Sequence, residues 1–367
     1  MSIDRRLLMK SAAALAATTA VPQWARAGNA FSPKPGEWRK FETVTRVEVA
    51  KPEGIVQAWI PLPAVDETDW MRSGESTWTT ESARAAIVVD KKYGAKMLHV
   101  IWPEGTAAPV IEVASRFETR DRFVDLATVG NAKPLTDAER VFYTEGTELI
   151  PVNGPVKDTA DKITQGAASD LEKARAIYEW VVDNTFRNPK TRGCGVGDIT
   201  FMLKSGDLSG KCADLNALYV GLARASGLPA RDVYGLRLGP SKFGYKSLGP
   251  STEIVTKAQH CRAEVFISGL GWVPVDPADV RKVVLEEPPG NLAVTDEKVA
   301  AARKTLLGAW EGNWVAYNWA HDVELPGSSA SKIAFLMYPQ VETSAGLLDC
   351  LDPDNVKYSI KAKELGV

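Results

Sequence analysis

The chain has 367 residues, which is enough for two or three domains because a single hydrophobic core usually stops growing at a smaller size. Hydrophobic residues make up 45% and charged residues 25% of the chain, as is ordinary for a globular protein. The formal net charge of −2 argues against nucleic acid as the main partner.

The first 27 residues resemble an export signal. Arg5 and Arg6 precede Leu-Leu-Met-Lys, an apolar, Ala-rich stretch follows over 11–21, and Ala25-Arg26-Ala27 matches an Ala-x-Ala cleavage site. The paired arginines are similar to those of a twin-arginine signal, so we expect residues 1–27 to be removed and the mature protein to be periplasmic. The alternatives are an ordinary secretory signal and a short membrane anchor, although this apolar run would barely cross a bilayer.

The mature chain is expected to be mildly acidic and not inserted in a membrane. Cleavage after Ala27 would remove four basic residues and one acidic residue, which changes the formal net charge from −2 to −5. No later segment of the sequence is apolar enough to span a bilayer, so we expect no stable membrane insertion after cleavage.

Residues 28–125 are predicted to form an N-terminal β-sandwich, or a small barrel, that begins with a linker rich in Pro and Gly. Several runs show strand-like patterns and are separated by turn residues. The predicted strands are 43–49, 55–60, 86–89, 96–101 and 110–119.

Residues 136–290 are predicted to form an α+β domain. Thr136 and Glu139 are typical of a capped helix start, and residues 170–185 have apolar positions at helical spacing that give one buried face. A second helix is predicted over 212–226, where Gly227-Leu228-Pro229 ends it. Strands are predicted at 231–238, 260–267 and 272–276.

Residues 291–367 are expected to pack on this domain. They contain a predicted helix near 296–307, an aromatic cluster over 310–319 and a closing strand over 357–363. The aromatic cluster could either cover a cleft or close the core.

The chain has four cysteines, Cys194, Cys212, Cys261 and Cys350. They form no CxxC motif and no tight cluster in the sequence, so a structural zinc site is not expected. An oxidising compartment would favour disulfides, whereas folding before twin-arginine export would disfavour them, and the pairing stays open.

Cys212 is placed at the first turn of a predicted helix, with Ser209 as the expected N-cap. The partial positive charge and free N–H groups of a helix N-terminus favour a thiolate and can bind an oxyanion. Cys212 is therefore a candidate nucleophile. The alternative is a buried structural cysteine.

A nucleophilic thiolate needs an imidazole and a group that orients the imidazole. Among the three histidines, His260 begins a predicted strand of a hairpin, and Asp276 ends the other. Because side chains alternate along strands, the two lie on one face only if the loop has an odd number of residues or a bulge intervenes.

Two sequence blocks resemble the bacterial transglutaminase-like superfamily, in order and spacing, over roughly residues 140–285. The first block is Gly210-Lys211-Cys212-Ala213-Asp214 with the run 222–231, and the second is His260-Cys261-Arg262-Ala263-Glu264-Val265 with the run 271–277. The resemblance implies a papain-like fold, with the cysteine helix packed on an antiparallel sheet. It further implies Cys212 as nucleophile, His260 as general acid/base and Asp276 as the orienting carboxylate.

The sequence departs from the family pattern after the histidine, where Cys261-Arg262 occupies the places of Ala-Trp in many members. We expect this change to affect the substrate channel without removing a member of the triad. Cys261 is expected to point away from His260 into the core. The loop 193–197 is interpreted either as a border of the active site or as a plain connector.

The resemblance implies a cysteine-dependent acyl-transfer enzyme that acts on amide bonds of peptides or proteins through a thioester, with no cofactor and no metal. We interpret it as a protease or amidase rather than a cross-linking transglutaminase, because nothing in the sequence marks a protected site for an amine. The alternative is a non-catalytic binding or assembly protein built on the same scaffold.

Overall fold

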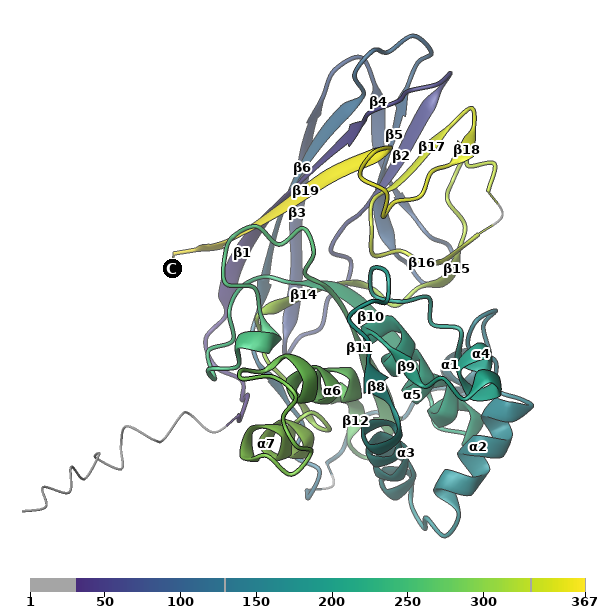
Figure 1. Ribbon diagram of the computed structural model, residues 1–367, viewed down its shortest axis with the longest axis vertical. Coiled ribbons are helices and arrows are strands. Elements are labelled where there is room, and N and C mark those ends of the chain that lie inside the picture. Colours follow the sequence, from purple (N-terminus) through teal and green to yellow (C-terminus); the bar gives the residue numbers. More distant parts are fainter. Residues whose placement is uncertain (1–30, 129, 331, 367) are drawn as a thin grey trace, which may run out of the picture.

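The computed structural model describes residues 31–128, 130–330 and 332–366. The predicted signal peptide, residues 1–27, lies outside the described residues. Within the described part of the chain, no helix combines the length and the apolar character needed to cross a membrane. One half of the molecule consists mainly of strands, and the other contains the helices together with a further sheet (Figure 1).

The helical half, here called the core domain, is built on a four-stranded sheet of order β12-β11-β10-β14 with helices packed against it. Its helices are α1 (Asp137–Thr144), α2 (Pro155–Thr164), α3 (Asp170–Asn184), α4 (Ile199–Ser205), α5 (Cys212–Ala225), α6 (Pro277–Glu286) and α7 (Glu297–Thr305), with a 3-10 turn η2 (Lys246–Leu248). Its strands are β8 (Phe186–Arg187), β9 (Ser209–Gly210), β10 (Ala230–Arg237), β11 (Gln259–Ile267), β12 (Gly271–Val275) and β14 (Trp314–Asn318).

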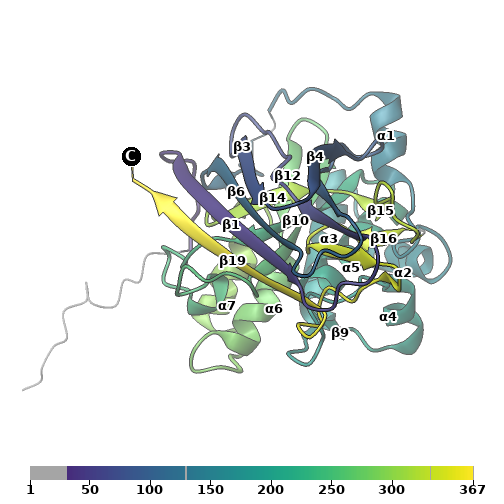
Figure 2. The same cartoon turned by 90° about the horizontal axis from the view of Figure 1, so that it is seen from above.

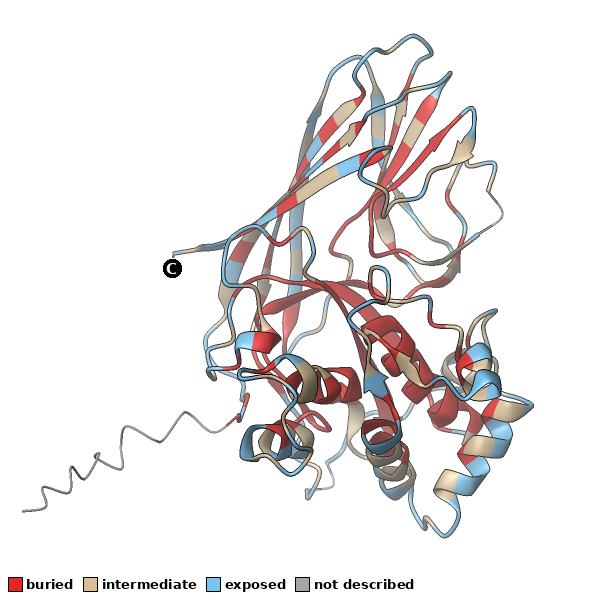
Figure 3. Ribbon diagram, in the orientation of Figure 1, coloured by how far each residue is buried: buried red, intermediate tan, exposed pale blue. Residues whose placement is uncertain are grey.

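Helix α5 is the centre of the core domain. All of its residues are buried, because it packs against α2 and α3 as well as against β10 and β11. A helix that is buried on every side needs apolar residues all round, and the run of Ala, Leu and Val in α5 provides them. Figure 3 shows α5, β10 and β11 as the largest continuous buried region of this half.

The predicted capped helix and the predicted helical face both occur in the structure. In α1 the Thr136 side chain accepts from the Glu139 N–H and the Glu139 carboxylate accepts from the Thr136 N–H, which is a capping box. In α3 the buried residues Ala174, Ile177 and Val181 fall on one side of the helix, as their spacing predicted.

The other half, here called the β domain, consists of two antiparallel sheets of order β19-β1-β6-β3 and β18-β17-β2-β5-β4. Its strands are β1 (Arg39–Val49), β2 (Val56–Pro61), β3 (Met71–Thr80), β4 (Arg84–Val89), β5 (Lys96–Trp102), β6 (Val110–Thr119), β17 (Gln340–Thr343), β18 (Gly346–Leu347) and β19 (Val356–Leu365). Burial alternates along β1, as expected for strands with one face on a core.

The C-terminal region is divided between the two halves. Helix α7 and strand β14 belong to the core domain, whereas β17, β18 and β19 complete the sheets of the β domain. The closing strand β19 pairs with β1 over ten residue pairs, and Figure 2 shows the two side by side. Two short strand pairs are also present, β7 (Arg122–Phe123) with β13 (Ala309–Trp310) and β15 (His321–Val323) with β16 (Ile333–Phe335).

Candidate active site

Cys212 is the first residue of α5 and is 4% exposed. The N-cap is Lys211, and its backbone N–H donates to the carboxylate of Asp214 in the first turn. The prediction that Ser209 caps this helix is wrong, because Ser209 lies in β9 and is two residues too early. The Cys212 thiol is therefore at the helix terminus, where unpaired N–H groups and the helix dipole favour a thiolate.

Asp214 organises the start of this helix. Its buried carboxylate accepts from the backbone N–H groups of Lys211, Val196 and Gly197 at 2.9, 3.0 and 2.9 Å. Three N–H donors fix the carboxylate between the helix and the loop 193–197. Asp214 thus holds the loop against the nucleophile, and its role is structural.

The loop 193–197 borders the candidate site, which decides between the two interpretations of its sequence. The Ala213 N–H donates to the Cys194 carbonyl at 2.9 Å, and Gly193 and Cys194 both line the cleft beside Cys212. Gly195 has a φ of +97°, and a Cβ there would lie 1.8 Å from a carboxylate oxygen of Asp214. Only glycine fits at this position.

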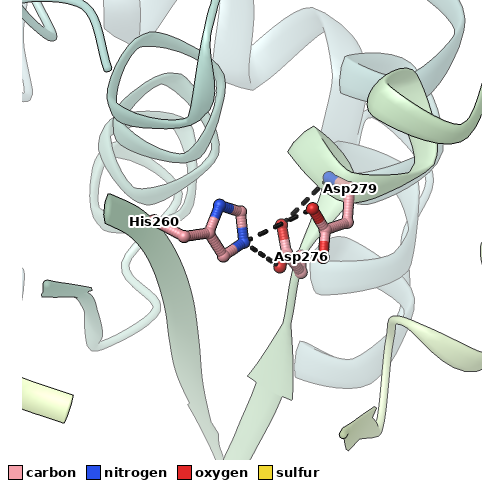
Figure 4. A group of neighbouring side chains, drawn as sticks. All are labelled: His260, Asp276 and Asp279. Carbon is pink, nitrogen blue, oxygen red and sulfur yellow. Dashed lines mark hydrogen bonds and ion pairs between the residues drawn. The ribbon is translucent and has the colours of Figure 1, made fainter. Parts of the chain in front are cut away.

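His260 and Asp276 lie on the hairpin of β11 and β12. Ile267 pairs with Gly271, so the loop 268–270 has three residues. This odd number places the two side chains on one face, and the Nε2 atom of His260 lies 2.7 Å from Oδ2 of Asp276. Figure 4 shows the Nε2 edge of the imidazole turned toward the carboxylates and the Nδ1 edge turned away from them.

A second carboxylate, Asp279, lies beside the same imidazole nitrogen at 3.4 Å. It sits in the first turn of α6, where its N–H donates to the Asp276 carboxylate at 3.1 Å. Arg237 of β10 binds both oxygens of Asp279, and Asn216 of α5 donates to Asp276 at 3.3 Å. Sequence reasoning missed these three residues. Only the spacing of Asp279 from Asp276, one helical turn, could have indicated any of them.

The charges around the imidazole favour its protonated form. Burial and the nearby Arg237 lower the pKa of His260, but the carboxylates of Asp279 and Asp276 outweigh them and the pKa is raised. The pKa of Asp279 is lowered, since Arg237 overcomes the effect of burial.

The nucleophile has two thiol neighbours. The neighbouring Cys194 and Cys261 side chains, together with His260, hold the pKa of Cys212 well below its usual value despite burial. The same contact raises the pKa of Cys194, and burial raises that of Cys261, so both remain protonated donors. All four cysteines are free, which leaves Cys212 available as a nucleophile.

Arg262, which replaces the tryptophan of many family members, is 2% exposed and lies behind the triad rather than in the cleft. Its guanidinium lies over the rings of Trp314 and Trp310 at 4.6 and 5.3 Å, and its Nε atom is 3.6 Å from Asp276. The expected effect of the missing tryptophan on the substrate channel stays a prediction. Arg262 adds a positive charge next to the orienting carboxylate.

His260, Asp276 and Asp279 could bring three ligand atoms within 4.8 Å of one another. However, Arg237 already binds Asp279 and Arg262 approaches Asp276. A cation at this point would compete with two buried guanidinium groups, so the arrangement fits an oriented imidazole better than a metal centre.

Cys212 and His260 open into a cleft of about 790 Å³. Its far wall comes from the C-terminal region, through Tyr338, Leu351 and Tyr358. The aromatic cluster 310–319 does not line the cleft and is largely buried, so it closes the core. The other histidines lie elsewhere, as His99 bonds Gln57 and His321 contacts Tyr234.

Comparison with known proteins agrees with this architecture. The model of the transglutaminase-like superfamily matches residues 157–277. An uncharacterized protein of Haemophilus influenzae is 36% identical over 327 residues, which cover 85% of this chain and 87% of the relative. An uncharacterized protein of Bacillus subtilis, YebA, is 23% identical over 234 residues, which cover 54% of this chain and 31% of that protein.

A solved structure shows the same fold. It is the crystal structure of a candidate cysteine protease from Cytophaga hutchinsonii, with a TM-score of 0.51 and 14% identity, and the match covers 89% of this chain and 99% of that one. At this identity the likeness concerns the fold alone. Together with the family match and the extended similarity to the Haemophilus protein, it leads to one conclusion: the chain belongs to the transglutaminase-like superfamily.

Proposed function

We propose that this protein is an exported cysteine-dependent enzyme that attacks amide bonds of peptides or proteins, with Cys212 as nucleophile, His260 as general acid/base and Asp276 as orienting carboxylate. The observation that carries the proposal is the placement of Cys212 at a helix N-terminus, in one cleft with a histidine that Asp276 binds at 2.7 Å. This is the arrangement by which thiols are activated for acyl transfer.

The first half of the reaction follows from these positions. The Cys212 thiolate attacks the amide carbonyl carbon, and the Cys212 N–H, which has no acceptor among the described residues, can donate to the oxyanion. The C–N bond then breaks as the His260 imidazolium gives its proton to the departing amine. A thioester on Cys212 remains, and Asp276 stabilises the imidazolium before the transfer.

The second half depends on the acyl acceptor. Water, deprotonated by His260, would release a carboxylic acid, whereas a lysine-like amine would give a cross-link. The cleft favours water, because eight Lys or Arg side chains and a single carboxylate line it. A protonated amine would be repelled there. We therefore propose a peptidase or amidase.

The test is a peptide-library digest by the mature protein, with Cys212→Ala in parallel and a primary amine present. New peptide termini that require Cys212 are expected. Amine adducts in place of new termini would show a transglutaminase. If neither new termini nor amine adducts form, the enzymatic proposal is contradicted.

Export is part of the proposal and rests on Arg5-Arg6 and the Ala-x-Ala site at residues 25–27. Substitution of both arginines by lysine is expected to retain the uncleaved protein in the cytoplasm. Fractionation with N-terminal sequencing measures this. Unchanged export would indicate an ordinary secretory signal.

A further inference from the structure

The lining of the active-site cleft carries a strong excess of positive charge. Eight of its side chains are Lys or Arg, and Glu286 is its one carboxylate. The whole chain, in contrast, has 44 basic and 46 acidic residues. The cleft therefore concentrates cations in a protein that is slightly acidic overall.

Five of these cations already have carboxylate partners. The pairs are Arg187 with Glu286, Arg192 with Asp349, Arg237 with Asp279, Lys282 with Glu286 and Lys357 with Glu48. Lys211, Lys246 and Lys257 form no ion pair with any described residue. Their charge is the part that the protein itself leaves unbalanced.

The three unpaired lysines come from different elements around the catalytic groups. Lys211 directly precedes Cys212, Lys257 lies three residues before His260, and Lys246 begins η2. Lys282 also experiences this positive electrostatic field. Burial and the nearby Arg237 and Arg187 lower the pKa of Lys282 to about 8. A ligand with negative charge would relieve this field.

We propose that the substrate of Cys212 is an acidic peptide segment, whose Asp or Glu carboxylates next to the attacked amide contact Lys211, Lys246 and Lys257. The inference rests on the proposed function, because a peptide is chosen over other polyanions on the ground that Cys212 attacks an acyl carbon. The cleft volume is in the range of sites that enclose a small ligand or a few residues of chain. Tyr338, Leu351 and Tyr358 offer apolar surface to the rest of such a segment.

The test uses three peptide libraries that are identical except for Glu, Gln or Lys at fixed positions on both sides of a random core. We expect kcat/KM for the Glu library to exceed that for the Gln library about tenfold at about 0.05 M NaCl, with the Lys library slowest. The preference is expected to shrink at about 0.5 M NaCl, because salt screens exposed charges.

The triple variant Lys211→Gln, Lys246→Gln, Lys257→Gln is expected to lose most of the preference for Glu over Gln. The matched control is Lys91→Gln, an exposed lysine between β4 and β5 that does not line the cleft. It should leave the preference unchanged. Equal rates for the Glu and Gln libraries in the unmodified protein would overturn the acidic substrate while leaving the thiol enzyme intact.

A second measurement tests the positive charge of the cleft without any substrate. The rates at which anionic iodoacetate and neutral iodoacetamide alkylate Cys212 are compared in the unmodified protein and the triple variant. The ratio of iodoacetate to iodoacetamide is expected to fall about tenfold in the variant. An unchanged ratio would overturn the inference, whereas a Cys212 that reacts with neither reagent would contradict the proposed function.

Discussion

Arg237 and Asp279 form a buried ion pair in which one guanidinium nitrogen lies 2.5 and 2.6 Å from the two carboxylate oxygens. The pair keeps Asp279 ionised although it is 1% exposed. The ionised carboxylate then lies 3.4 Å from Nε2 of His260 and supports the imidazolium. Asp279 is thus a positioning residue that acts through His260, and Arg237 acts through Asp279.

Replacement of Asp279 by Asn tests this chain of contacts. The carboxylate raises the pKa of His260, so its removal is expected to lower that pKa, by about one unit for an interaction of roughly 1.4 kcal/mol. The imidazolium would then lose its proton at a lower pH. An NMR titration of the His260 ring measures the pKa directly.

The same substitution leaves Arg237 buried without its partner, so stability must be followed in parallel. A loss of about 3–5 kcal/mol is expected from the unpaired guanidinium. Asp279→Glu, which keeps the charge, should restore most of the His260 pKa. A His260 pKa that is equal in Asp279→Asn and the unmodified protein would refute the positioning role.

Replacement of His260 by Ala tests the thiolate. The lowered pKa of Cys212 and the raised pKa of His260 together predict a thiolate–imidazolium pair that persists from acid to neutral pH. Iodoacetamide should therefore label Cys212 rapidly at about pH 6, where a thiol of ordinary pKa near 8.5 is almost fully protonated. In His260→Ala the labelling rate at this pH should fall by more than tenfold.

The matched control for this variant is His99→Ala, since His99 lies in β5 of the β domain and bonds Gln57. Its labelling rate should equal that of the unmodified protein. If Cys212 is inert toward iodoacetamide at every pH in the unmodified protein, the chain is a non-catalytic scaffold.

The nucleophile, the histidine and the aspartate could be predicted because each lies in a local pattern. Cys212 starts a helix, and His260 and Asp276 lie at the same end of one hairpin. Whether the His260 and Asp276 side chains share a face depends on whether the loop between the two strands has an odd or even number of residues. The strand pattern alone does not fix the strand ends to within one residue, so it does not determine this number. The structure gives three loop residues and so the required parity.

The supporting groups could not be predicted, because they converge from distant parts of the chain. Arg237 and Asp279 lie 42 positions apart, and no periodic pattern links a buried strand to the first turn of α6. The helix cap was missed for a related reason. Asp214 serves that role from inside the helix, and the N-cap itself is Lys211, a residue type that rarely caps.

The strands of the β domain were also only partly predictable from the sequence. The sequence pattern correctly indicated β1, β2, β4, β5 and β6, but β3 was missed, because its burial alternates poorly and Gly74 lies within a bulge of this strand. The sequence pattern predicts β19 as a strand but does not indicate which sheet edge it joins. That choice is made by tertiary contact, through its pairing with β1.

Replacement of Cys194 by Ser tests the contribution of the neighbouring thiol. The Cys194 side chain lowers the pKa of Cys212, so its replacement is expected to shift the acid limb of the alkylation profile toward higher pH, by about one pH unit. The matched control is Cys350→Ser, because Cys350 also lines the cleft but is not among the main groups that shift the pKa of Cys212. Equal shifts in both variants would argue against a specific thiol contact.

Replacement of Gly195 by Ala tests the loop that borders the nucleophile. The substitution forces a side chain into a φ of +97° and places its Cβ against the buried Asp214 carboxylate. Gly105→Ala is the matched control, since Gly105 has a φ of +85° with nothing within 4 Å of its Cβ. The backbone penalty of about 1 kcal/mol should appear in both variants, and overpacking should add about 1–3 kcal/mol in Gly195→Ala alone.

Urea unfolding separates the two contributions, and Cys212 alkylation reports their consequence at the site. Because Asp214 also receives the N–H of Lys211, a displaced carboxylate would loosen the start of α5. We therefore expect slower alkylation of Cys212 in Gly195→Ala and an unchanged rate in Gly105→Ala. Equal destabilisation of the two variants would mean that the loop yields to the added methyl group and that Asp214 does not anchor it.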